Sequence, residues 1–223
     1  GFFTPYLDGS PRLQKPPLVY WAMIGLGMAF GNSLFVARLP GVVCAAGLAV
    51  ATMCLARDLG CRRDRLAAAG VLTLTCLGVY VLGRMALLDV PLACLVAWSI
   101  AAFVRWSRRG APAWLIVSAL AAGLSAMAKG PPGPLFVAGV AAGRMLVFGE
   151  WRRVARSWRL VLAALCVFLL TALAWPAAEA ARWGEQFWAT MRAELVTKRF
   201  SPTRSQGPLT ILGGFLGLVM PWA

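Results

Sequence analysis

Long apolar runs separated by short charged segments constrain this chain more than any other feature. Six runs are long enough, or nearly so, to cross the hydrocarbon core of a bilayer, which takes about 17 to 25 helical residues. They cover residues 39–56, 66–82, 88–104, 113–127, 134–148 and 160–174, and a partial seventh covers 209–222. With 60% hydrophobic residues and a mean hydropathy of +0.73, the chain is too apolar for a soluble domain. The sequence therefore predicts an all-α, polytopic transmembrane helical bundle.

The charged segments between these runs indicate which side of the membrane each connection occupies. Three connections are rich in arginine, and they alternate with connections that carry little charge. The arginine-rich ones hold Arg57, Arg62, Arg63 and Arg65, then Arg105, Arg108 and Arg109, then Arg152, Arg153, Arg156 and Arg159. By the positive-inside rule these connections are cytoplasmic, so the corners with Arg84, Asp89 and Lys129 face the periplasm of a bacterial inner membrane. The net charge of +14 comes from short clusters of arginine between apolar runs, so no nucleic-acid partner is expected. Membrane lipids are the expected partners of these clusters.

The chain reads as a single membrane domain over residues 1–223, without internal repeats or a soluble domain. In this interpretation its parts are an external loop at 1–37, spanning helices at 38–174, a second external loop at 175–208 and a partial span at 209–223. The first residue is Gly1, and the last run has no polar tail after it. We therefore expect a chain shortened at both ends.

The apolar run Leu18–Phe30 is too short to span and predicts an interfacial helix. Pro16 and Pro17 suit its first turn, and Tyr20 and Trp21 suit the level of the lipid headgroups. If this run spanned instead, Lys15 would not share a face with Asp89 and Lys129.

The cysteines do not form a recognisable ligand set. Five of the six lie within apolar runs, Cys61 lies in an arginine-rich loop, and no two have the spacing of metal ligands or redox pairs. Histidine is absent, so a His-ligated metal site cannot be built from this chain. The cysteines are expected to be small packing residues.

Three charged residues at the predicted periplasmic corners are candidates for anion binding. Lys15 precedes a helix start, where free N–H groups and an ammonium suit a phosphate, although a lysine there can also snorkel to lipid headgroups. Asp89 lies at the mouth of a span and needs a cation from Arg84, Lys15 or Lys129, or else caps the following helix. Lys129 lies in a corner rich in Gly and Pro that exposes backbone amides, although a lysine at a helix C-terminus is also an ordinary dipole partner.

These segments together resemble a family of polytopic membrane glycosyltransferases. The family includes bacterial aminoarabinose transferases acting on lipid A and the protein O-mannosyltransferases. The similarity runs nearly end to end, through Asp8-Gly9, residues 15–21, Ala37-Arg38-Leu39-Pro40, residues 84–92, Ala128-Lys129-Gly130-Pro131, Lys198-Arg199-Phe200 and Met220-Pro221-Trp222. Each piece alone is weak, and their combination in this order is specific.

The resemblance implies a C-type glycosyltransferase fold and transfer of a sugar from a polyprenyl phosphate, of the undecaprenyl type, to a lipid, glycan or protein acceptor. It assigns donor binding to Lys15, Arg84, Lys129 and Arg199, a supporting role to the acid Asp89, and motif positions to Gln14, Pro16, Pro17, Tyr20, Trp21, Gly130 and Pro131. The family's catalytic Asp would precede Gly1, so this segment alone is expected to be inactive. Some relatives hold an acid before the lysine and a later His that could bind a metal. Gln14 and the absence of His speak against a divalent metal here.

Two other functions remain open from the sequence. A transporter or channel would place charges near the middle of spanning helices and show repeat symmetry. A membrane scaffold would use its arginine loops to hold acidic lipids, which leaves Lys15, Asp89 and Lys129 unexplained. The identities of the sugar and of the acceptor stay open.

Overall fold

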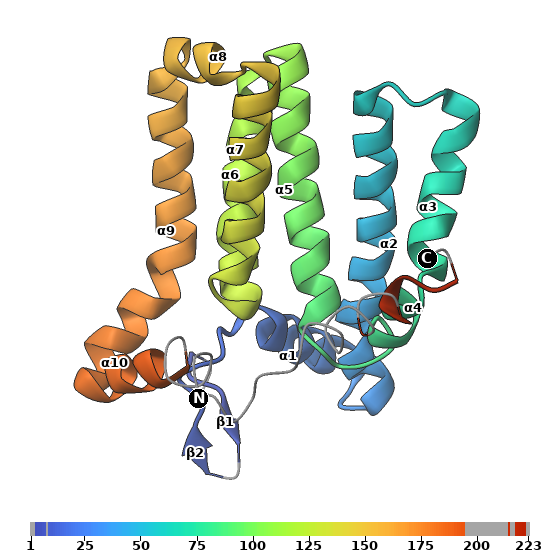
Figure 1. Cartoon of the computed structure of the whole chain (residues 1–223). Coiled ribbons are helices and arrows are strands. Elements are labelled where there is room, and N and C mark those ends of the chain that lie inside the picture. Colours follow the sequence, from blue (N-terminus) through green and yellow to red (C-terminus); the bar gives the residue numbers. More distant parts are fainter. Residues whose placement is uncertain (1–2, 8, 195–213, 215–216, 222–223) are drawn as a thin grey trace.

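The computed structural model describes residues 3–7, 9–194, 214 and 217–221, and over these ranges the chain forms a helical bundle (Figure 1). The helices are α1 (Leu18–Phe30), α2 (Leu34–Leu59), α3 (Leu66–Thr75), α4 (Leu77–Leu82), α5 (Asp89–Arg109), α6 (Pro112–Lys129), α7 (Pro132–Phe148), α8 (Trp151–Arg156), α9 (Trp158–Trp183) and α10 (Glu185–Arg192), with a 3-10 turn at Arg63–Arg65. Two short strands, β1 (Tyr6–Leu7) and β2 (Ser10–Pro11), pair as an antiparallel hairpin. The prediction of an all-α membrane bundle is confirmed.

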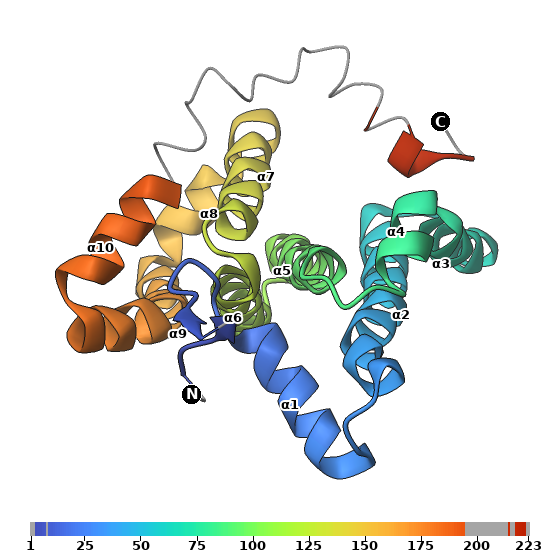
Figure 2. The same ribbon diagram turned by 90° about the horizontal axis from the view of Figure 1, so that it is seen from below.

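Helix α5 lies at the centre of the bundle, between α2 and α6, and α6 in turn packs against α9 and α7 (Figures 1 and 2). Near one end of the bundle, Phe103 and Trp106 of α5 form a buried apolar cluster with Leu115 of α6 and Ala164 of α9. This cluster fixes the relative rotation of three helices.

Local sequence signals set the helix ends. The Ser33 hydroxyl accepts a hydrogen bond from the Val36 N–H at 3.2 Å and caps the start of α2. Gly60 and Gly110 end α2 and α5 with φ angles of +98° and +76°, a left-handed conformation that favours glycine. Pro112 then begins α6, where its missing N–H costs no hydrogen bond.

Four of the six expected spans are helices long and apolar enough to cross a membrane: α2, α5, α6 and α9. The run at 134–148 belongs to α7, which has 17 residues. The prediction of one continuous helix over 66–82 was wrong, because the chain is extended at Cys76 (φ −56°, ψ 128°) and separates α3 from α4. Just before the break, the Thr73 and Thr75 hydroxyls donate to carbonyls four residues back, a bond that often bends helices.

Helix α1 has the predicted bounds and lies across the end of the bundle, from the side of α6 to that of α2 (Figure 2). This arrangement is consistent with the interfacial helix that we predicted. The hairpin of β1 and β2 precedes it, turning at Gly9 with φ +76°.

The boundary expected after residue 174 differs from the structure. Helix α9 continues to Trp183 with Pro176 inside it, and α10 follows, so much of the segment that we expected to be a loop is helical. Proline interrupts the backbone hydrogen bonds of a helix, and α9 bends in its last part toward α10 (Figure 1). Only part of the last expected run, 209–222, lies within the described residues. That part contacts α4, because the Leu77 N–H donates to the Met220 carbonyl at 2.8 Å.

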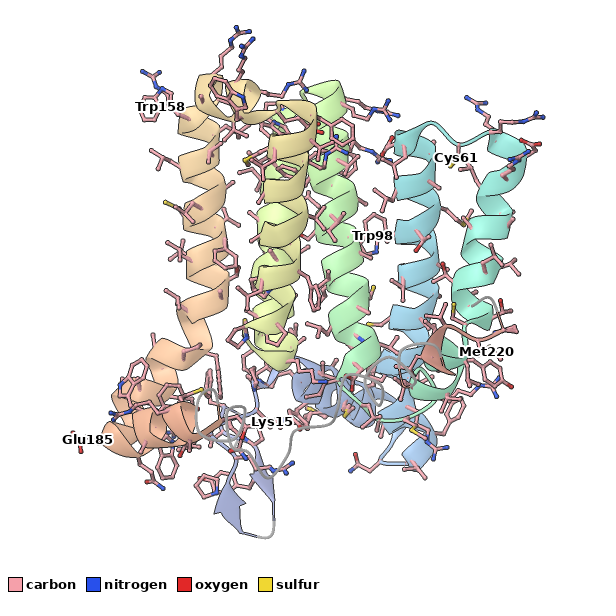
Figure 3. All side chains as sticks on the ribbon, in the orientation of Figure 1. Lys15, Cys61, Trp98, Trp158, Glu185 and Met220 are labelled. Atoms are coloured by element: carbon pink, nitrogen blue, oxygen red, sulfur yellow. The ribbon has the colours of Figure 1, made fainter. Side chains whose placement is uncertain are left out.

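The two ends of the bundle differ in charge, as the alternation of loops predicted. The loop with Cys61 and the segment with Trp158 lie at one end, and Lys15 and Glu185 lie at the other (Figure 3). We call these the arginine end and the lysine end. The arginine end carries the connections α2–α3, α5–α6 and α7–α9.

Candidate active site

A cavity of about 590 Å³ lies at the lysine end, a size typical of ligand pockets. It is bounded by the segment before α1, the corner between α6 and α7, and the last parts of α9 and α10. Gln14, Lys15 and Lys129 supply polar groups, and most of the remaining wall is apolar. That wall includes Leu135, Phe168, Leu173, Trp188 and Met191. The cavity therefore joins two ammonium groups to a surface suited to hydrocarbon.

Lys129 is the last residue of α6, and its ammonium donates to Oδ1 of Asp89, the first residue of α5. Both side chains are partly exposed, so the pair lies at the surface of the site. Of the three cations considered for Asp89, the structure pairs it with Lys129. The interpretation of Asp89 as an N-cap was wrong, because Leu88 occupies that position and Asp89 lies within the helix.

Lys15 is held beside the cavity by a turn and a buried anchor. Its N–H donates to the Arg12 carbonyl at 3.2 Å, and Pro16 and Pro17 lead directly into α1. Leu13, 1% exposed, lies in an apolar cluster with Met127, Trp175 and Phe187. This cluster ties the segment before α1 to α6, α9 and α10.

The corner after Lys129 allows α6 and α7 to meet with almost no loop. Gly130 has φ +92°, and its N–H donates to the Ala126 carbonyl at 2.7 Å, which ends α6. Pro131 is the N-cap of α7, and Pro132 is its first residue. Gly130 and Pro131 both line the cavity, so the motif shapes its wall.

The other motif residues lie at the start of α1 and do not line the cavity. Pro17 is buried at the start of α1. Trp21 packs against the Leu13 cluster and makes an edge-on contact with Phe3 at 6.1 Å between ring centroids. Tyr20 is partly buried on the same helix.

Arg84 is separate from this group. Its guanidinium stacks over the ring of Tyr80 at 3.9 Å from the centroid, and it does not line the cavity. Arg199 lies outside the described residues. The structure thus brings together Gln14, Lys15 and Lys129, with Asp89 as the partner of Lys129, while the predicted donor-binding role of Arg84 and Arg199 stays a prediction.

Helix α10 and Glu194, two residues after its end, contribute a wall that the sequence interpretation missed. Phe187, Trp188, Met191 and Glu194 all line the cavity. Their spacing is that of one helix face, a signal that was present in the sequence within the segment taken as a loop. Glu194 adds a carboxyl group to a site that was expected to hold mainly cations.

The arginine end holds a second charged cluster, around Asp58 at the end of α2. The Asp58 side chain is 2% exposed and accepts hydrogen bonds from Arg105 Nε at 2.6 Å and Arg109 Nη2 at 3.1 Å. Arg108 donates to the Asp58 backbone carbonyl, and Arg105 stacks over the ring of Trp114. Arginines predicted only as markers of sidedness therefore join α2 to α5.

Within the described residues, no three His, Cys, Asp or Glu side chains are grouped as metal ligands would be. Among the described residues that line the cavity, side-chain oxygens come from Gln14 and Glu194.

Comparisons with known proteins agree with this architecture. Residues 14–175 match the sequence profile of the dolichyl-phosphate-mannose-protein mannosyltransferase family. The undecaprenyl phosphate-alpha-4-amino-4-deoxy-L-arabinose arabinosyl transferase of Pseudomonas aeruginosa strain UCBPP-PA14 is 35% identical over 195 residues, which are 83% of this chain and 35% of that relative. The chain thus spans about a third of the length of this relative.

Two crystal structures of ArnT from Cupriavidus metallidurans have the same fold over the whole of this chain and 41% of theirs, at 22% identity. The TM-score is 0.86 for the structure bound to undecaprenyl phosphate and 0.81 for the apo state. The C-type fold expected from the sequence is confirmed.

Proposed function

Because this chain belongs to the dolichyl-phosphate-mannose-protein mannosyltransferase family, we propose that it forms part of a membrane glycosyltransferase. The enzyme transfers a sugar from a polyprenyl phosphate to a lipid, glycan or protein acceptor. The relative from P. aeruginosa is named for an undecaprenyl phosphate-linked sugar, so undecaprenyl phosphate is the carrier that we propose here.

One observation carries this proposal: the cavity places Lys15 and Lys129 beside an apolar wall. A polyprenyl phosphate has the same division, with an anionic head and a hydrocarbon chain. Lysine ammoniums bind phosphate as point charges, and the wall from α7, α9 and α10 can cover the first isoprene units. Gln14 can donate or accept a hydrogen bond at the same end of the cavity.

The two lysines of the cavity differ in the positive charge that they offer to the phosphate during sugar transfer. In the transfer, an acceptor oxygen attacks the anomeric carbon, the bond between that carbon and the phosphate oxygen breaks, and the acceptor proton passes to a base. The leaving phosphate gains negative charge, which nearby cations stabilise. Lys15 offers its ammonium to this charge, while Asp89 orients Lys129 and offsets part of its charge.

The sidedness of the bundle supports a periplasmic site. The arginine end is cytoplasmic by the positive-inside rule, and the cavity lies at the opposite end (Figure 3). A polyprenyl phosphate reaches such a cavity from the outer leaflet of the inner membrane.

A transporter is less well supported. Lys129 and Asp89 lie at the ends of their helices, not midway along them. Charges along a solute path would lie deeper in the bundle.

The test is sugar transfer by the complete protein in proteoliposomes containing a sugar-loaded undecaprenyl phosphate and membrane acceptors. Lys15→Ala should raise the KM for the donor about 10- to 100-fold, the range expected for loss of a hydrogen bond to a charged group. Arg192→Gln is the matched control, because Arg192 is an exposed cation on α10 that does not line the cavity. Wild-type KM in Lys15→Ala, or an equal rise in Arg192→Gln, contradicts the assignment.

A further inference from the structure

A buried carboxylate lies next to the segment that leads to Lys15. Glu179, on α9 beyond Pro176, is 1% exposed. Its two carboxylate oxygens lie 2.8 and 3.0 Å from the hydroxyl oxygen of Thr4, which is also 1% exposed. The indole Nε1 of Trp183 lies 3.5 Å from the same hydroxyl oxygen. The acid therefore holds a specific residue of the N-terminal segment.

The environment of Glu179 makes this placement costly. In the described part of the chain, no lysine or arginine nitrogen lies within 4 Å of its carboxylate. A buried acid with few polar partners loses hydration that a leucine at the same place would not lose. A residue kept under that cost needs a role beyond filling space.

The N-terminal segment is fastened to α9 at a second point. The indole Nε1 of Trp175 donates to the Phe3 carbonyl at 3.1 Å, one residue before Thr4. These two bonds attach the start of the hairpin to the part of α9 that lies beyond the last expected span.

The hairpin carries this attachment on to Lys15. The Arg12 N–H donates to the Pro5 carbonyl at 2.7 Å and closes the hairpin, and the Lys15 N–H donates to the Arg12 carbonyl at 3.2 Å. Together with the pairing of β1 and β2, these two hydrogen bonds connect Thr4 to Lys15 through the backbone. A shift at Thr4 would therefore be passed through the hairpin to the backbone of Lys15.

We propose that Glu179 is a positioning residue for phosphate recognition, which acts through Thr4 and the hairpin to set the place of Lys15 in the cavity. The proposal rests on the proposed function, since the phosphate ligand there is Lys15. Glu179 does not line the donor cavity. It lines a smaller cavity of about 420 Å³ with Phe3 and Arg182, so its effect on the donor is indirect.

The experiment is a double-mutant cycle on the complete protein, with binding of undecaprenyl phosphate in nanodiscs as the primary measurement and sugar transfer as the second. Glu179→Leu removes the acceptor, and Glu179→Gln keeps an oxygen that can accept from Thr4. Each is made in the wild-type and the Lys15→Ala background. Glu179→Leu should weaken binding about tenfold in the wild-type background and not further in Lys15→Ala, and Glu179→Gln should bind as wild type. In transfer assays, Glu179→Leu should raise the donor KM and leave kcat nearly unchanged.

A merely structural role gives a different pattern. If Glu179→Leu weakens binding by the same factor in both backgrounds, or not at all where Lys15→Ala does, the proposal is overturned. If Glu179→Leu does not fold, Thr4→Val, which replaces the hydroxyl with a methyl group, enters the same cycle, with Thr4→Ser as its conservative partner. Failure of transfer with intact phosphate binding would count against the proposed function alone, because the binding cycle still reports on Glu179.

Discussion

The ammonium of Lys129 donates to the carboxylate of Asp89 and so joins the last residue of α6 to the first residue of α5. The pair brings together two residues that lie 40 positions apart in the sequence. It also halves the free positive charge that the two lysines of the cavity would otherwise present.

Removing Asp89 should therefore change the rate of sugar transfer more than stability. Both side chains are partly exposed, so the ion pair itself contributes only about 0 to 1 kcal/mol to folding. In Asp89→Ala the Lys129 ammonium is no longer oriented, and we expect a lower kcat at a nearly unchanged melting temperature. Parallel kinetics and thermal unfolding of the complete protein measure both quantities. A melting temperature that falls together with an unchanged kcat would show that the pair is structural.

The buried acid at the arginine end should behave in the opposite way. Asp58 is enclosed and binds Arg105, so Asp58→Ala leaves a buried guanidinium without its partner and should cost about 3 to 5 kcal/mol. Asp64→Ala is the matched control, since Asp64 pairs with Arg62 at the exposed surface and should cost at most about 1 kcal/mol. Thermal unfolding in detergent separates the two variants. Equal melting temperatures would contradict the assigned role of the Asp58 cluster.

A close approach between α6 and α9 should make one glycine intolerant of a methyl group. A Cβ at Gly123 would overlap the Thr171 hydroxyl and lie 3.1 Å from the Phe168 carbonyl. Gly123→Ala should therefore destabilise the bundle by about 1 to 3 kcal/mol. Gly139→Ala in α7 is the control, because no atom of another described element lies within 4 Å of its Cβ position, and the better helix propensity of Ala should make it neutral or stabilising. The same unfolding assay compares them, and a neutral Gly123→Ala would disprove the close packing.

A native cysteine allows sidedness to be tested. Cys61 is exposed in the loop at the arginine end, and Glu185 is exposed at the lysine end (Figure 3). With the other cysteines replaced, an impermeant maleimide should label Cys61 only in inside-out vesicles, and Glu185→Cys, made in a protein lacking Cys61, only in right-side-out vesicles. Labelling of both from one side would contradict the separation of the two ends across the membrane, and the exchanged pattern would reverse the topology; either result rules out the periplasmic site.

The sequence was most informative where apolar periodicity and loop charge act locally. The arginine-rich connections were predicted to share one end of the bundle, and they do, while Pro16 with Pro17 marked the start of α1. The motif around Lys129 and Gly130 predicted a tight corner, and the structure has one.

Contacts between side chains of different helices could not be predicted from the sequence. The choice of Lys129 as partner for Asp89 depends on how α5 and α6 lie side by side, and three cations were equally possible from the sequence. Asp58 was unremarkable beside its arginines until burial was known. The break between α3 and α4 at Cys76 was missed because the residues on both sides of it are as apolar as those of an unbroken span.

Pro176 has a consequence for water in the donor cavity. Proline has no N–H, so the Ala172 carbonyl one turn earlier lacks its usual helical donor, and both residues line the cavity. A carbonyl left bare in hydrocarbon costs several kcal/mol, and membrane proteins tolerate such groups where they line hydrated space. Water or another polar group at this point of the α9 wall would give that carbonyl a hydrogen-bond donor. A lipid carrier entering the cavity would lay its hydrocarbon chain on apolar side chains of the wall such as Phe168 and Leu173, while a sugar hydroxyl could replace the water at the Ala172 carbonyl without losing a hydrogen bond.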